Sequence, residues 1–110
     1  MLMKSRLTVE EKDAYWNDGY LFPIDVANEI QARKWRNYLE KIEYDWLDNG
    51  LALPLNTYKR VNAQVVMPLA CEIGLHEPIL NAVEGILGPD VMLYSVEFLT
   101  KEPHTKHIVT

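Results

Sequence analysis

The sequence changes character at Gly88-Pro89-Asp90, and this break constrains the fold more than any other feature of the chain. Before it, apolar residues recur at spacings of three to five, as on one face of a helix. After it, Val91 to Thr100 is rich in β-branched and aromatic residues, which predicts a strand. Helices followed by a sheet predict an α+β fold.

The helical part begins with a capping box at Thr8 to Glu11. In this motif the threonine hydroxyl accepts from the amide of the glutamate, whose side chain reaches back to the threonine amide. A short helix is expected to follow and to end near Gly19, because glycine readily adopts the left-handed conformation of a helix end. The run Tyr20 to Phe22 predicts a brief extended segment before Pro23.

The longest predicted helix follows Asp25, which can cap it. Opposite charges four residues apart are expected to support its outer faces. These are Glu29 with Arg33, Arg36 with Glu40, and Lys41 with Asp45, while the apolar stripe is Ile30, Trp35, Leu39, Ile42 and Trp46.

The segment from residue 48 to the break predicts two further helices. Asp48 to Gly50 should close the long helix, and residues 51–60 predict a loop around Pro54. Pro68 suits the first turn of a helix that runs to about Gly74, and His76-Glu77-Pro78 opens the last one. Beyond Thr100, residues 102–106 predict a turn and His107 to Thr110 the start of a second strand.

Composition indicates one soluble domain over residues 1–110, with a helical part at about 8–90 and a core strand at about 91–101. Apolar residues make up 48% of the 110 residues and charged residues 25%, both ordinary values. The net charge of -5 disfavours nucleic acid and anionic lipid as partners. Cys71 is the only cysteine, and neither a signal peptide nor a membrane span is evident, so a cytoplasmic protein is expected.

The predicted sheet is incomplete within these residues. One long apolar strand and two short ones do not make a self-sufficient sheet, and an open edge promotes aggregation. We therefore expect the chain to be part of a longer protein. The alternatives are that helices cover residues 91–100, or that this segment pairs in a homodimer.

Four stretches, in order, resemble the phytanoyl-CoA dioxygenase family, and together they span almost the whole chain. They are the opening helix with its Asp18-Gly19-Tyr20 turn, the amphipathic helix after Asp25, the segment from Asn62-Ala63-Gln64 through His76 to Asp90, and the strand ending at Lys101-Glu102-Pro103.

The resemblance implies the N-terminal helices and first strands of a double-stranded β-helix (jelly-roll, cupin-like) oxygenase. Such enzymes use Fe(II), 2-oxoglutarate and O2 to hydroxylate, and sometimes halogenate, small organic substrates. Their iron is held by a His-x-Asp pair and a distant histidine. No His-x-Asp or His-x-Glu occurs in this chain, so no catalytic or metal-binding residue is expected and the chain alone should be inactive.

The resemblance also implies that Lys101 lies near the 2-oxoglutarate pocket. An ammonium beside a dicarboxylate makes physical sense as a charge-assisted contact. The alternative is a solvated lysine at the end of a strand.

Structural roles explain the remaining candidates more simply. His104 and His107 are three residues apart, so on a strand they would point to opposite sides, and an iron triad also needs a carboxylate. His76 is expected at a helix end, Cys71 as a buried thiol, and Trp35, Tyr38 and Trp46 as packing residues of the long helix.

A second class of function remains open. The chain could be a small, non-catalytic helical interaction protein that homodimerises through its exposed strand at residues 91–100. An open reading frame after the Thr110 codon, encoding His-x-Asp, would favour the oxygenase.

Overall fold

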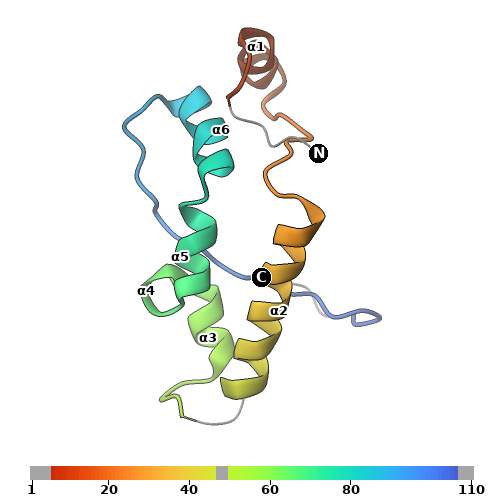
Figure 1. Ribbon diagram of the computed structural model, residues 1–110, viewed down its shortest axis with the longest axis vertical. Helices are drawn as coiled ribbons and strands as arrows, with labels where there is room; N and C mark the ends of the chain where they lie inside the picture. Colours follow the sequence, from red (N-terminus) through yellow and green to blue (C-terminus); the bar gives the residue numbers. More distant parts are fainter. Residues whose placement is uncertain (1–5, 47–49, 107–110) are drawn as a thin grey trace.

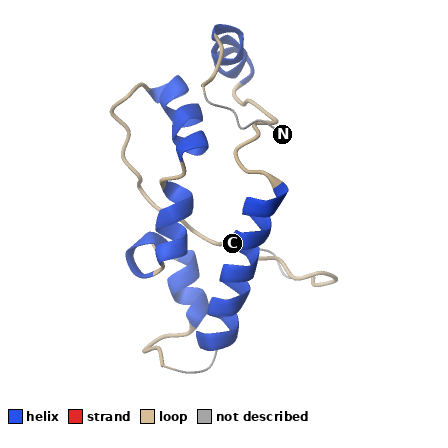
Figure 2. Cartoon of the chain, in the orientation of Figure 1, coloured by secondary structure: helices blue, strands red, loops and turns tan. Residues whose placement is uncertain are grey.

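The computed structural model describes residues 6–46 and 50–106, which form six helices joined by loops (Figures 1 and 2). No strand occurs among these residues. The helices are α1 (Val9–Asp18), α2 (Glu29–Trp46), α3 (Leu55–Arg60), α4 (Ala63–Val66), α5 (Pro68–Gly74) and α6 (Glu77–Leu87).

The helices form an elongated arrangement. In Figure 1, α3, α5 and α6 follow one another along one side, α2 lies beside the lower part of this column, and α1 sits near α6. α2 contacts α5, and α1 contacts α6. The radius of gyration is 16.3 Å, whereas a compact domain of this length has about 13 Å. Many large apolar side chains of the described residues are also exposed, among them Phe22, Tyr44 and Met92.

The capping box at the start of α1 is confirmed. The Glu11 amide donates to Thr8 Oγ1 at 3.1 Å, and the Thr8 amide donates to Glu11 Oε1 at 2.9 Å. Gly19 ends the helix with φ of 83°, and its N–H donates to the Tyr15 carbonyl at 2.8 Å. Residues 20–22, predicted as a brief extended segment, are neither helix nor strand.

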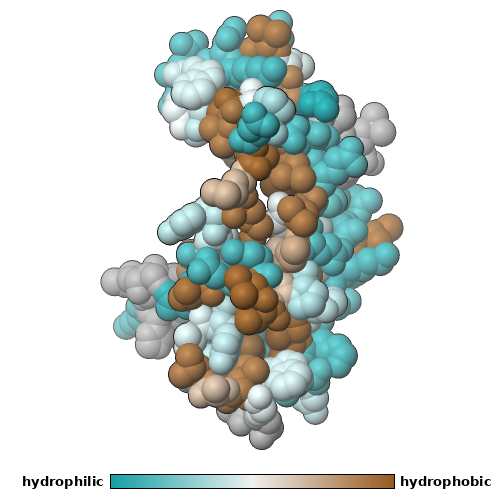
Figure 3. Space-filling view, turned by 90° about the vertical axis from the view of Figure 1, so that its left-hand side faces the viewer, coloured by the Kyte–Doolittle hydropathy of each residue, from teal (hydrophilic) through white to brown (hydrophobic). Residues whose placement is uncertain are grey.

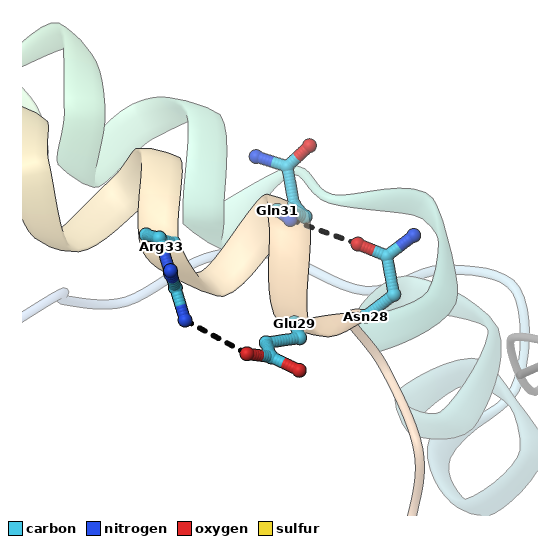
Figure 4. A network of polar contacts seen from close by, with 4 residues as sticks. All are labelled: Asn28, Glu29, Gln31 and Arg33. Carbon is cyan, nitrogen blue, oxygen red and sulfur yellow. Dashed lines mark hydrogen bonds and ion pairs between the residues drawn. The ribbon is translucent and has the colours of Figure 1, made fainter.

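All three predicted charge pairs of α2 are present: Glu29–Arg33 at 2.7 Å, Arg36–Glu40 at 2.9 Å and Lys41–Asp45 at 2.6 Å. The cap was predicted wrongly. Asn28 caps the helix in place of Asp25: its Oδ1 accepts from the Gln31 amide at 2.8 Å, a contact drawn in Figure 4. A side chain reaches the amide three residues ahead only from the position just before the helix, and α2 begins at Glu29.

The loop predicted for residues 51–60 is wrong in its second half, where α3 begins directly after Pro54. Leu55 and Lys59 lie one turn apart and are both buried. Burial of Leu55 and Lys59 therefore stabilises α3, although the apolar residues of this segment do not recur at a helical spacing in the sequence.

A small apolar core joins α4 and α5 to α2. Ala63, Met67 and Ala70 are buried together, and Leu39 and Ile42 of α2 pack against them. Val96 and Phe98, from the segment after α6, complete this cluster.

The predicted α+β fold is wrong, because the described chain is helical and its core strand at about 91–101 does not form. The segment runs as a non-helical length of chain back past α5 (Figure 1). A strand requires a backbone ladder with another strand. Here the partners are helix ends instead: the Ala63 amide donates to the Val96 carbonyl at 2.9 Å, and the Phe98 amide donates to the Lys59 carbonyl at 2.8 Å. The predicted second strand at 107–110 lies outside the described residues.

Candidate functional site

Lys101 lies exposed at the end of the segment that follows α6. A turn comes directly after it: the Thr105 amide donates to the Glu102 carbonyl at 3.4 Å, and the Thr105 hydroxyl donates to the same oxygen at 3.0 Å. No hydrogen bond or ion pair ties Lys101 to another residue of the described ranges. Among the described residues, its ammonium therefore has no partner.

The histidines do not converge. His104 is exposed in the turn with φ of 62°, and His107 lies outside the described residues. Across residues 6–46 and 50–106, no three His, Cys, Asp or Glu side chains are grouped so as to hold a metal ion.

His76 links two parts of the chain that are far apart in sequence. It stands at the N-cap position of α6, as expected, but its side chain does not cap the helix. Its Nε2 lies 2.7 Å from the Val26 carbonyl oxygen, and its ring meets Trp35 edge-to-face at 4.9 Å. Trp35 Nε1 in turn donates weakly to Glu72 Oε1 at 3.5 Å. This arrangement joins α2 to the α5–α6 corner and serves packing.

The aromatic residues of α2 are only partly packed. Trp35 is half-buried, whereas Tyr38 and Trp46 are each 45% exposed. The last two line a cavity of about 340 Å³ together with Leu55, Tyr58 and Met67 among others. The expectation of a core-packing stripe therefore holds for Trp35 and fails for the other two. Cys71, predicted to be buried, is half-buried in α5.

The buried ion pair of Lys59 was not predicted. Lys59 is 4% exposed, and its Nζ lies 3.6 Å from Glu43 Oε2 on α2. Because lysine is usually exposed, the sequence gives no sign of this burial. The residue ties α3 to α2, and its carbonyl also holds Phe98.

Apolar side chains gather in a band along the face that carries α4, α6 and the segment after it (Figure 3). A second cavity, of about 260 Å³, lies between α1 and α6 and is lined by Leu7, Tyr15, Ile86 and Leu87 among others. These surfaces lack the convergent polar groups of a typical small-molecule site.

No family model, curated protein or solved structure matches the chain significantly. Within the described part of the chain, the helices are all too short or too polar to cross a membrane.

Proposed function

We propose that the chain is the helical N-terminal part of an Fe(II)/2-oxoglutarate-dependent oxygenase of the phytanoyl-CoA dioxygenase type, acting on a small organic substrate in the cytoplasm. The proposal is supported by the order of its four family-like stretches. α1 ends at the Asp18-Gly19 turn, α6 ends at Gly88-Pro89, and a non-helical apolar segment then leads to the exposed Lys101. This placement of Lys101 is the observation on which the proposal mainly depends.

The residues described do not fit an iron site, and no catalytic step is assigned to them. The ring of His76 is directed to the Val26 carbonyl, and His104 belongs to no group of three potential metal ligands among the described residues. In the proposal, the iron ligands belong to residues beyond this chain. The helices provide a scaffold for the segment that carries Lys101.

Replacement of Lys101 by alanine in the longer oxygenase tests the proposal. Loss of a charge-assisted hydrogen bond costs about 1.5–3 kcal/mol, so the Kd for 2-oxoglutarate should rise about 10- to 150-fold. Helical content should not change, because Lys101 is exposed. Calorimetric titration with 2-oxoglutarate measures the effect.

Lys106→Ala provides the matched control, since Lys106 is also exposed and lies just beyond the turn. It should leave the Kd within about twofold of the unaltered protein, since an exposed charge that makes no direct contact contributes little. Equal Kd values for the two variants would return Lys101 to the role of a solvated lysine.

We also propose a second candidate function, self-association of the chain through residues 91–100. One observation favours it. The segment is held by hydrogen bonds at Tyr94, Val96 and Phe98, while no described residue bonds to the backbone of Glu97 or Leu99.

A further inference from the structure

The segment after α6 bonds to the rest of the described chain through only one of its two backbone edges. The amide and carbonyl of Val96 bond to Gln64 Oε1 and the Ala63 amide, both at 2.9 Å, and the Phe98 amide bonds to the Lys59 carbonyl. In an extended chain, the backbone groups of successive residues point to opposite edges. The edge of Val96 and Phe98 therefore faces α3 and α4.

Within residues 6–46 and 50–106, the opposite edge has no partner. It consists of the backbone groups of Glu97, Leu99 and Lys101, which we call the free edge. None of these groups bonds to another described residue, and all three side chains are exposed. Val96 and Phe98 pack on the core, so the side chains of the free-edge residues share the outer face.

The charges along the free edge are self-complementary. Glu97 and Lys101 lie at equal distances on either side of Leu99. If two copies meet antiparallel with Leu99 opposite Leu99, each Glu97 lies opposite the Lys101 of the other copy. Opposite charges facing each other across two strands are favourable, whereas a register centred on Glu97 would oppose two carboxylates.

We propose that two copies of this chain pair through their free edges as antiparallel strands, with Leu99 at the two-fold axis and two Glu97–Lys101 pairs flanking it. The same patch then serves both copies, as in a two-fold symmetric dimer. The ladder ends where Ser95 meets Pro103, because proline has no N–H to donate. This inference deepens the second candidate function and does not rest on the oxygenase proposal.

Charge reversal tests the register. Each single variant, Glu97→Lys or Lys101→Glu, places two like-charge pairs in every dimer and should raise the dimer dissociation constant about tenfold or more. The double variant restores opposite charges and should return the constant to within about threefold of the original. Sedimentation equilibrium of the 110-residue chain measures it, and circular dichroism checks that the helices remain.

The direction in which each single variant changes the dimer dissociation constant distinguishes an effect of net charge from an effect of strand register. The chain carries a net charge of -5, so Glu97→Lys lowers the overall repulsion between copies and Lys101→Glu raises it. The register predicts that both variants weaken the dimer. Met92→Asp, at an exposed residue away from the free edge, is the control and should leave the dimer nearly unchanged.

Two outcomes would overturn the proposal and are distinguishable. If the chain is a monomer at every concentration up to about 1 mM, self-association through the free edge is excluded. This result would agree with a free edge that pairs with another strand of a longer protein. A dimer that is strengthened by Glu97→Lys, or not restored in the double variant, would keep self-association and exclude this register.

Discussion

Replacing Glu43 by glutamine is expected to lower the free energy of unfolding by about 2 kcal/mol. The change leaves the ammonium of Lys59, which is 4% exposed, without its carboxylate partner. Breaking a fully buried ion pair typically costs about 3–5 kcal/mol. The expected value is lower because the Glu43 side chain is 34% exposed and water screens the pair.

Two control variants separate the cost of an unpaired buried charge from the cost of losing any ion pair. Lys59→Met keeps the apolar stem and removes the buried charge, so it should change stability by less than about 1 kcal/mol. Glu40→Gln breaks the exposed pair with Arg36 and should cost at most about 0.5 kcal/mol. Urea unfolding monitored by circular dichroism compares all three. Equal losses for Glu43→Gln and Glu40→Gln would show that Lys59 is not buried.

Replacing Gly74 by valine is expected to cost about 2 kcal/mol and to loosen the segment after α6. A Cβ at Gly74 would lie 2.9 Å from Leu93 Cδ2 and 3.1 Å from Val96 Cγ2, inside normal contact distance. Overpacking of this kind costs about 1–3 kcal/mol. Because Val96 would be displaced, the amides of Val96 and Phe98 should exchange faster with solvent.

A second substitution at Leu93 tests whether steric overlap causes the loss of stability in Gly74→Val. In a Gly74→Val/Leu93→Ala chain, the removed side chain makes room for the added methyl groups, so more than half of the lost stability should return. Gly74→Ala should cost less than about 1 kcal/mol, since the flexible end of Leu93 can move aside and Val96 needs only a small shift. Unfolding in urea and amide hydrogen exchange provide the readouts. Absence of rescue would mean that residues 93–96 do not pack on α5.

The helices could be predicted because their signals are local. The Thr8–Glu11 capping box and the Gly19 stop involve residues within one or two turns of each other, and both are confirmed. The cap of α2 was missed although its residue type was right. Asp25 and Asn28 are both suitable caps, and only the path of the chain before Glu29 decides between them.

The strand at about 91–101 was predicted wrongly because strand pairing is not local. The β-branched and aromatic residues of Val91 to Thr100 predicted a strand, but the segment is neither helix nor strand. Whether such a segment joins a ladder depends on a partner strand, and here the amides and carbonyls of α3 and α4 take that place. The burial of Lys59 was missed for the same reason, since it arises from the packing of α3 against α2.

Of the candidate site, Lys101 was expected at the end of a strand; it is exposed at the end of a segment that forms no strand, and its role beside 2-oxoglutarate stays a prediction. The chemistry expected from the resemblance depends on a His-x-Asp pair that these residues do not contain. Packing within the chain can neither supply that pair nor replace it. The central claim is therefore tested most directly outside the described helices.

The decisive measurement is the reading frame that follows the Thr110 codon in the messenger RNA encoding this chain. If the chain is the N-terminal part of an oxygenase, the frame continues and encodes a His-x-Asp pair within a few codons. A stop codon directly after Thr110, found in the messenger RNA itself, would contradict the oxygenase proposal and leave self-association through the free edge as the function to pursue.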